Sequence, residues 1–390
     1  MKLEESVSIV REIMAEYAKL TGLSPVMHPP KRYLWTDAFA LCNFLGLYRE
    51  TEDEAYRDLA RRLIMQVHDT LGRHHPDDLR KGWISGLSEE EGKRHPAIGG
   101  LRIGKKLNER PPHVPLDERL EWDRDGQYLH YLTKWMHALN RASKVIDDFT
   151  FNRWAMELAK TAHAHFVYTV PSLHGRKRMY WKMSIDLSYP LISSMGHHDP
   201  LDGYITYSQL QATGKKDPER PPGLANEIAD MANMCKEKDW ATDDPLGIGG
   251  LLSDAYRAAQ LIVSKNLEEI SLPLALLKAS LTGLAMYTHQ DRLKSPATRR
   301  LAFRELGLSI GLGAVENLST LVRQNRYVFA PENGLYEIIE DLMDFVPVKE
   351  GIEEFWLRPA SQATESWSEH REINLVMLAT SLAPHGFLTL

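Results

Sequence analysis

The chain has 390 residues, of which 43% are hydrophobic and 26% are charged, and its formal net charge is −6. This composition is typical of a globular protein that buries a substantial core. With an isoelectric point near 6.3, the chain has no global basic field, so we expect neither nucleic acid nor a membrane as a partner.

Two further features indicate the compartment. The first residues, Met1–Glu5, are charged and amphipathic and lack the apolar core of a signal peptide, and no run of ~18 consecutive apolar residues could span a membrane. Cys42 and Cys235 are too few for a disulfide framework or a cysteine-rich zinc site. We therefore expect a cytoplasmic protein, and its oligomeric state stays open.

Helical patterns dominate from the start of the chain. Residues 3–21 place apolar side chains three and four positions apart and predict a packing helix. Asp37–Tyr48 carries few charges and predicts a buried helix, whereas Glu52–Leu71 has one apolar and one charged face and predicts a helix that faces solvent. Together these two segments predict a hairpin with an inner and an outer helix.

The same couplet returns along the chain. The predicted inner and outer helices are 126–140 with 152–168, 184–195 with 223–235, 246–263 with 272–287, and 304–321 with 334–345. A sixth inner helix, 372–382, is expected to pair with the N-terminal helix and to close a ring. Strand patterns are nearly absent, and residues 166–171 are the best candidate. Six such pairs predict an all-α (α/α)6 toroid that forms a single domain over residues 1–390.

Two connections are long. Residues 72–121 are rich in glycine and proline, which argues against a continuous helix and predicts a lid inserted beside one mouth of the ring. Residues 197–222 are predicted to be a second insertion, between the two halves of the third hairpin.

Most of the predicted inner helices follow an aromatic residue and one or more carboxylates. These entrances are Trp35 with Asp37, Trp122 with Asp123 and Asp125, Trp181 with Asp186, Trp240 with Asp243 and Asp244, and Trp367 with Glu369 and His370. If the inner helices begin on one side of the ring, the entrances meet at one mouth. Such a mouth suits a sugar, because a pyranose face stacks on indole while carboxylates accept hydrogen bonds from hydroxyl groups. The alternative is that each aspartate caps a helix and each tryptophan packs in the core.

Other motifs suggest different chemistry. His197 and His198 could hold a metal ion with Asp199, but no histidine pair four residues apart with a third ligand nearby occurs, so neither a metal nor a cofactor is expected. Gly99–Lys106 has the glycine spacing of a phosphate loop but ends in lysine where serine or threonine is required, which argues against nucleotide hydrolysis.

On its hairpin count, its length and its aromatic and acidic entrances, the chain resembles the six-hairpin (α/α)6 toroids, which include the six-hairpin glycosidase superfamily and the N-acylglucosamine 2-epimerase family. The Trp-x-Arg-Gly-x-Gly-Trp motif of unsaturated glucuronyl hydrolases is missing, which argues against that subfamily. The resemblance implies a cavity at the mouth of the inner ring and a carbohydrate or sugar-like ligand.

The leading hypothesis is a glycoside hydrolase that uses two carboxyl groups. Asp186 and Glu369 are the predicted acid–base pair, because they follow entrances on opposite sides of the ring, and Asp125 and Asp244 are held in reserve. The residues predicted to bind the substrate, a small molecule or an oligosaccharide, are Trp35, Asp37, Trp122, Trp181, His197, His198, Trp367 and Arg371.

Two alternatives remain open. A sugar epimerase or isomerase would use His370 together with His197 or His198 as acid and base. A toroid without catalytic activity would use the same mouth to bind a small ligand or a protein partner.

Overall fold

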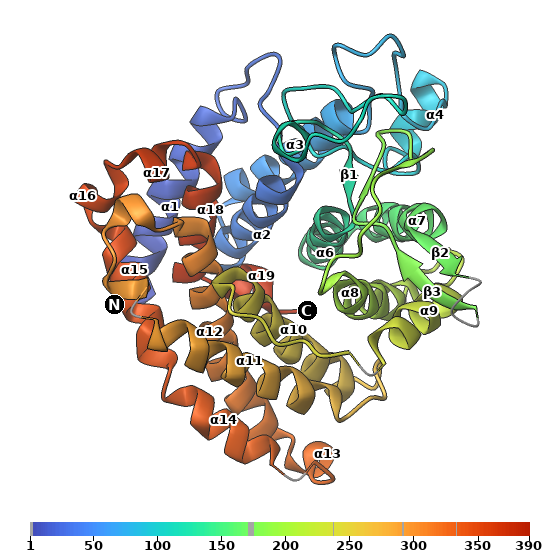
Figure 1. Cartoon of the computed structure of the whole chain (residues 1–390). Coiled ribbons are helices and arrows are strands. Elements are labelled where there is room, and N and C mark those ends of the chain that lie inside the picture. The colour runs from blue at the N-terminus through green and yellow to red at the C-terminus, as the bar shows by residue number, and fades with distance from the viewer. Residues whose placement is uncertain (1–2, 171–174, 237, 291, 333) are drawn as a thin grey trace. The chain divides into compact units, whose positions relative to one another are not determined.

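The computed structural model of the chain describes residues 3–170, 175–236, 238–290, 292–332 and 334–390 (Figure 1). Most of these residues are helical, and the strands are short. The chain forms two compact units, one made of Ala18–Lys238 and the other of Asp239–Leu390 together with the residues up to Tyr17. We name them the 18–238 unit and the 239–390 unit. The single domain with an insertion at 72–121 stays a prediction. No helix within the described ranges is long and apolar enough to cross a membrane.

The 18–238 unit begins with helix α2 and ends after helix α9. Its helices are α2 (Leu34–Thr51), α3 (Glu54–Leu71), α4 (Glu89–Arg94), α5 (Glu118–Glu121), α6 (Leu129–Ile146), α7 (Phe149–Phe166), α8 (Asp199–Gly214) and α9 (Ala225–Cys235). Its strands are β1 (Gln127–Tyr128), β2 (Val167–Val170), β3 (Arg176–Met179), β4 (Lys182–Met183) and β5 (Pro190–Ile192). The strands form two small antiparallel sheets, β1-β4-β5 and β2-β3.

Three helix pairs build this unit, and they are α2 with α3, α6 with α7, and α8 with α9. Helices α2 and α8 are buried over nearly their whole surface, whereas α3 buries a single stripe. Helix α6 packs against both α2 and α8, so these three form an inner layer, and α3, α7 and α9 lie outside it. The first two predicted hairpins, 37–48 with 52–71 and 126–140 with 152–168, are confirmed.

The third hairpin differs from the prediction. Residues 184–195 were expected to be its inner helix, but they contain the β4–β5 turn, in which Leu187 has a left-handed φ of 61° and Pro190 has no N–H to give to a helix. The inner helix is α8, which lies within the predicted insertion 197–222. Many of the residues in α8 are polar and yet buried, and this mixture resembles a connection in the sequence.

The predicted strand at 166–171 is β2, which begins directly after α7 and pairs with β3 from Val167 opposite Met179 to Val170 opposite Arg176. Pro171 lies outside the described residues. The candidate was ambiguous between a strand and a helix end, and the structure contains both, one after the other.

Residues 72–121 are fastened to the beginnings of α2 and α6. The Leu34 amide, at the start of α2, donates to the carbonyl of Ile103 over 3.0 Å. Arg102 is buried, forms a 2.8 Å ion pair with Asp125 before α6, and donates to two carbonyls next to the end of α3. Gly104 has a left-handed φ of 97°, and a side chain there would collide with the carbonyl of Arg32. The segment 101–103 is therefore buried, whereas residues 111–120 are exposed or half-buried, and the lid stays a prediction.

The 239–390 unit includes helix α1 (Leu3–Leu20) up to Tyr17. Its other α-helices are α10 (Pro245–Val263), α11 (Leu272–His289), α12 (Ala302–Gln324), α13 (Arg326–Phe329), α14 (Leu335–Met343), α15 (Val346–Leu357), α16 (Pro359–Gln362), α17 (Glu365–Ser368), α18 (Arg371–Leu382) and α19 (His385–Leu388). Two 3-10 turns, η2 (Arg292–Lys294) and η3 (Ala297–Arg299), precede α12.

The predicted pairs in this unit are only partly those observed. Helix α10 packs against α11, as expected for 246–263 with 272–287. Helix α12 packs against α14, the predicted partner, and more extensively against α15, which was not predicted. Helix α18 lies beside α1, because Arg371 forms a 2.5 Å ion pair with Glu16. Helix α18 packs mainly against α12, so its pairing with the N-terminal helix stays a prediction.

Helices α10 and α12 meet backbone to backbone. A side chain at Gly249 in α10 would collide with the carbonyl group of Gly307 in α12, and one at Gly311 would collide with Gly249 itself. The three glycines therefore let the two helix axes approach more closely than any other residue would allow.

We expect Gly249→Ala to destabilise the protein by about 1–3 kcal/mol, because the added methyl group forces α10 and α12 apart. The matched control is Gly250→Ala, where the new methyl group has no atom within 4 Å. The control should be neutral or stabilising by up to about 1 kcal/mol, because alanine favours a helix more than glycine does. Urea unfolding of the two variants measures the difference, and equal stabilities would show that the helices are not in this close contact.

A buried histidine makes the 18–238 unit sensitive to acid. His68 in α3 is 1% exposed and lies edge-on to the rings of Trp135 in α6 and Trp154 in α7. The indole N–H of Trp135 donates to its Nε2 over 3.1 Å, which requires that nitrogen to carry no proton. Burial lowers the pKa of His68 from 6.5 to about 3.

Because the pKa of His68 is lower in the folded state than in the unfolded state, the free energy of unfolding should fall as the pH drops below about 6.5. The loss from this one group approaches about 1.4 kcal/mol per pH unit. In His68→Gln, whose amide still accepts from Trp135 but does not titrate, the dependence on pH should be shallower by that amount. Unfolding measured at pH 7.5, 6.5, 5.5 and 5.0 checks this, and parallel curves would contradict it.

Candidate functional site

The first turns of α2, α6 and α8 converge within the 18–238 unit. Tyr33, which precedes α2, hydrogen-bonds through its hydroxyl to the hydroxyl of Tyr131 in α6 at 2.8 Å. Lys134, one turn further along α6, forms a 2.6 Å ion pair with Asp202 in the first turn of α8. The three inner helices of this unit therefore begin at one end, as the shared mouth required.

Aromatic rings form a continuous wall at this end. The ring contacts run from Trp35 to Tyr131, from Tyr131 to Tyr128 and His130, from these two to Trp181, and from Trp181 to Trp122, with centroid distances between 4.8 and 6.5 Å. Three of the predicted substrate-binding tryptophans, Trp35, Trp122 and Trp181, thus belong to one cluster. They come from α2, from the end of α5, and from the loop before β4.

An acid and a base lie together at the start of α8. Asp199 is the first residue of α8 and is 5% exposed, and its Oδ1 lies 3.8 Å from Nδ1 of His130. Within the described residues, neither Oδ2 of Asp199 nor Nδ1 of His130 has a hydrogen-bond partner. Both atoms are buried, and buried polar atoms are nearly always paired, so an unpaired acid and base at this position mark a candidate site.

The pKa values of Asp199 and His130 stand in the reverse of their usual order, so the carboxyl group holds its proton to a higher pH than the imidazole does. Burial, and next the negative charge of Asp202, raise the pKa of Asp199 to about 7. Burial lowers the pKa of His130 to about 4. At neutral pH the carboxyl group of Asp199 therefore carries a proton in about half of the molecules, while the imidazole is neutral. Such a pair can donate a proton at one atom and accept one at another.

The surroundings of Asp199 fix its position. Gly196 lies directly against the carboxyl group, and a side chain at 196 would occupy the same space. Lys238 donates to the carbonyl of His197, and its charge partly offsets the negative charge of Asp199. The rings of His197 and His198 lie 4.6 Å apart, directly before α8. Two of the predicted substrate-binding histidines thus flank the acid, although the sequence did not single out Asp199 as an acid.

Asp186, the predicted catalytic acid or base, is held differently from Asp199. Its Oδ2 lies 2.5 Å from Arg80, and its Oδ1 accepts hydrogen bonds from Ser184 and Ser188. Burial alone would raise the pKa of Asp186, but the hydrogen bonds from Ser188 and Ser184 and the charge of Arg80 together lower it. Asp186 is therefore an ionised carboxylate whose ion pair holds the Arg80 side chain against the β4–β5 turn.

Two other predicted aspartates hold the backbone. Asp37 is 1% exposed, pairs with Arg32 at 3.1 Å and accepts from the amide of Tyr33. Asp125 is fully buried, pairs with Arg102, and accepts from the amides of Gly104 and Gly126. Both have the cap and anchor contacts that formed the alternative to a role in binding or catalysis.

The remaining predicted residues belong to the 239–390 unit. Asp244 caps α10 and pairs with Arg304 at 2.7 Å, and Trp367 is buried and stacks on Trp356. Glu369, His370 and Arg371 are exposed at the start of α18. Since Asp186 and Glu369 lie in different units, their pairing as acid and base stays a prediction, and so does the role of His370 with His197 or His198.

Sequence reasoning missed the residues that form the centre of this cluster. They are Tyr128, His130, Tyr131, Lys134 and Asp202, while Asp199 was considered only as a metal ligand beside His197 and His198. One signal was available in the sequence, because proline is favoured in the first turn of a helix and Asp199-Pro200 is therefore a helix start. A helix that begins there places Asp199 and Asp202, three residues apart, on one face. On α6, His130 and Lys134 are four residues apart and face the same two aspartates.

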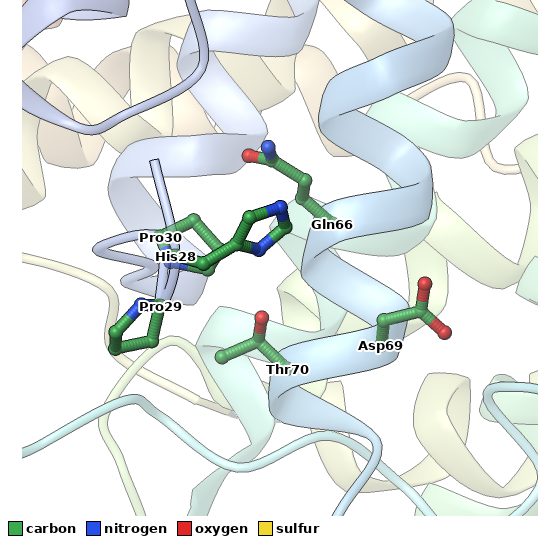
Figure 2. Close-up of a pocket in the computed structure, with 6 residues that line it drawn as sticks. All are labelled: His28, Pro29, Pro30, Gln66, Asp69 and Thr70. Carbon is green, nitrogen blue, oxygen red and sulfur yellow. The ribbon is translucent and has the colours of Figure 1, made fainter. Parts of the chain in front are cut away.

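One cavity of about 530 Å³ lies elsewhere in this unit (Figure 2). Its walls are the segment His28–Pro30 and three residues of α3, Gln66, Asp69 and Thr70, and the imidazole of His28 points toward Gln66. It contains none of the residues predicted to bind or react, so we do not assign it to the chemistry described above.

No protein-family model matches the sequence, and no curated protein matches it. Among solved structures, the chain is similar to an alpha-1,6-mannanase of glycoside hydrolase family 76 from a Salegentibacter species, with 11% identity, a TM-score of 0.53, and coverage of 97% of this chain and 99% of that one. An inactive variant of that mannanase with two aspartates changed to alanine, in complex with alpha-1,6-mannotetrose, gives a TM-score of 0.54 at 10% identity, with coverage of 97% and 99%. A family 76 alpha-mannanase from Bacteroides thetaiotaomicron gives 0.53 at 8% identity, with coverage of 98% and 96%.

At these identities the likeness concerns the fold. It extends over nearly the whole length of both chains, and it confirms the predicted fold class and the resemblance from which the predicted sugar ligand was drawn. The chain has the fold of the six-hairpin (α/α)6 toroids.

Proposed function

We propose that the protein is a carbohydrate-active enzyme, and that it hydrolyses a glycosidic bond with Asp199 as the proton donor. The observation that carries this proposal is a buried carboxyl group that holds a proton near neutral pH at the end of an aromatic wall. The similarity to alpha-mannanases in fold adds support, because it makes a glycoside a natural first substrate class to test.

The geometry assigns different tasks to the two aspartates of α8. Asp199 has a raised pKa and can give its proton to the oxygen that leaves the sugar carbon. Water then adds to that carbon, and the proton that the water loses returns to the Asp199 carboxylate. Asp202 pairs with Lys134, so it is expected to stay ionised and to stabilise the positive charge that develops on the sugar ring. Residues three apart on a helix are neighbours on its surface, with about 5–6 Å between their Cβ atoms, so one sugar ring can contact both.

The aromatic wall would hold the sugar against this pair. Trp181 and His130 are nearly parallel, with 14° between their planes, and Tyr128 adjoins both. Ring faces of this kind bury the C–H face of a pyranose, while the paired hydroxyls of Tyr33 and Tyr131 offer donors and acceptors to its hydroxyl groups. The substrate class that fits is a pyranoside.

A second candidate function rests on His130. A neutral imidazole beside a protonated carboxyl group is the arrangement that a sugar epimerase or isomerase needs to remove a proton from a sugar carbon and to return it. This is the predicted alternative activity with a different histidine in the role of base. A binding protein without turnover remains the third hypothesis.

We keep the cytoplasm as the proposed location. Its support is that Cys42 and Cys235, the two cysteines of the chain, form no disulfide with each other.

One test of the proposed function concerns the proton donor, Asp199. Asp199→Asn should lower kcat/KM on a responsive glycoside by about 10²- to 10⁴-fold, since an amide cannot donate the proton. In the wild type, kcat/KM should fall tenfold per unit as the pH rises above about 7, because Asp199 then loses its proton. A panel of aryl and natural glycosides, with α-mannosides included, supplies the substrate.

Asp186→Asn and Glu369→Gln are measured beside Asp199→Asn, because they remove the acid–base pair predicted from the sequence. If Asp199→Asn keeps wild-type turnover and these two lose it, the sequence-based pair is right and the assignment to Asp199 is wrong. Thermal unfolding of all three variants separates loss of chemistry from loss of fold.

A further test separates the hydrolase activity from the epimerase activity. A hydrolase incubated in water enriched in oxygen-18 should place the label in the released sugar, and His130→Gln should then reduce turnover without abolishing it. An epimerase should instead exchange a carbon-bound hydrogen of the sugar for deuterium from heavy water, and His130→Gln should abolish that exchange. If neither label appears and a sugar still raises the melting temperature, the binding hypothesis is supported and both activities are refuted.

A further inference from the structure

Trp122 is an unusually exposed tryptophan beside the candidate site. Its side chain is 57% exposed, the largest exposure among the large hydrophobic aromatic residues of the 18–238 unit within the described ranges. Single exposed apolar residues are common, but a large aromatic ring normally buries most of its surface. The position of Trp122 at the end of the aromatic wall therefore needs an explanation.

The backbone on both sides of Trp122 is rigidly held. Lys182 is fully buried and forms a 2.8 Å ion pair with Glu121, and it donates to the carbonyls of Glu121 and Arg124. Arg110 also pairs with Glu121 at 3.1 Å. Asp117 caps the short helix α5 that leads to Trp122. A ring that is exposed only because its loop is loose would not require such a buried ionic support.

The exposed ring is continuous with the site. Trp122 meets Trp181 edge to face, with 5.6 Å between the centroids and 76° between the planes. Trp181 in turn faces His130, whose Nδ1 lies 3.8 Å from Asp199. Trp122 is thus one ring contact further from the acid than Trp181. A ligand that reaches from Asp199 to Trp122 passes two successive ring contacts, of 6.4 and 5.6 Å between centroids, which is more than one sugar unit covers.

We propose that Trp122 is the platform of an outer subsite, on which a second sugar unit of an oligosaccharide stacks while the first is held at Trp181 and His130, next to Asp199. This inference rests on the proposed function in that it takes the ligand to be a carbohydrate. It adds that the substrate is an oligosaccharide, and that a monosaccharide glycoside fills only part of the site. Stacking on an aromatic face recognises the shape of a pyranose and no charged group is required.

The experiment measures binding first, so that it does not depend on turnover. Asp199→Asn protein is titrated calorimetrically with mono-, di- and tetrasaccharides from an oligosaccharide panel that includes alpha-1,6-mannotetrose. We expect the tetrasaccharide to bind more tightly than the monosaccharide, and Trp122→Ala in the same background to weaken only the longer ligands, by about tenfold, which corresponds to about 1.4 kcal/mol. Trp122→Phe keeps an aromatic face and should restore most of that loss.

The control is Tyr327→Ala, which removes an aromatic side chain that is 81% exposed in the 239–390 unit and should leave every affinity unchanged. If Trp122→Ala weakens all chain lengths equally, or none, or if the protein binds no oligosaccharide in the panel, the inference is overturned. Length-dependent binding without any turnover would refute the proposed hydrolase and leave the outer subsite standing. On a cleaved substrate, Trp122→Ala should raise KM for the tetrasaccharide.

Discussion

The complete burial of the inner helices governs where chemistry can occur in this chain. Helices α2 and α8 are covered on nearly every side, so their middle turns contact only protein. Side chains that reach a ligand must therefore come from the ends of these helices, and in the 18–238 unit the N-terminal ends of α2, α6 and α8 meet. A helix N-terminus carries a partial positive charge that favours an ionised carboxylate, yet burial raises the pKa of Asp199. Desolvation is thus the larger of the two opposing effects.

Much of the fold could be predicted from the sequence because the burial of a helix determines how its apolar and charged residues are spaced. A helix covered all round, such as 37–48, carries few charges, and an outer helix such as 52–71 shows one apolar stripe, so both are visible in composition alone. Helix α8 was missed because its buried residues include Asp202 and Gln209, which bond to Lys134 and Asn140 of α6. Buried polar networks are invisible to any method that reads hydrophobicity.

Three tryptophans of the candidate site could be predicted from the sequence, but the carboxyl group that holds a proton could not. Trp35 and Trp122 come together because the starts of α2 and α6 converge, which follows from the repeated pattern, whereas Trp181 reaches them from the loop before β4. Which carboxylate is protonated depends on its partners from distant segments: Asp186 faces an arginine 106 residues away in the sequence, while Asp199 faces a neutral imidazole. Pairings over such separations leave no local trace, so an aspartate that reacts and one that anchors a loop look alike in the sequence.

The glycine contact between α10 and α12 has a consequence for how the sequence can change. In an ordinary core contact, a larger side chain on one helix can be accommodated by a smaller one on its partner. At Gly249 the partner is the backbone of Gly307, which is already the smallest residue and has nothing left to remove. A larger residue at 249 could be accommodated only by a shift of α10 or α12 as a whole. Position 249 therefore either stays glycine or changes together with the spacing of the two helices.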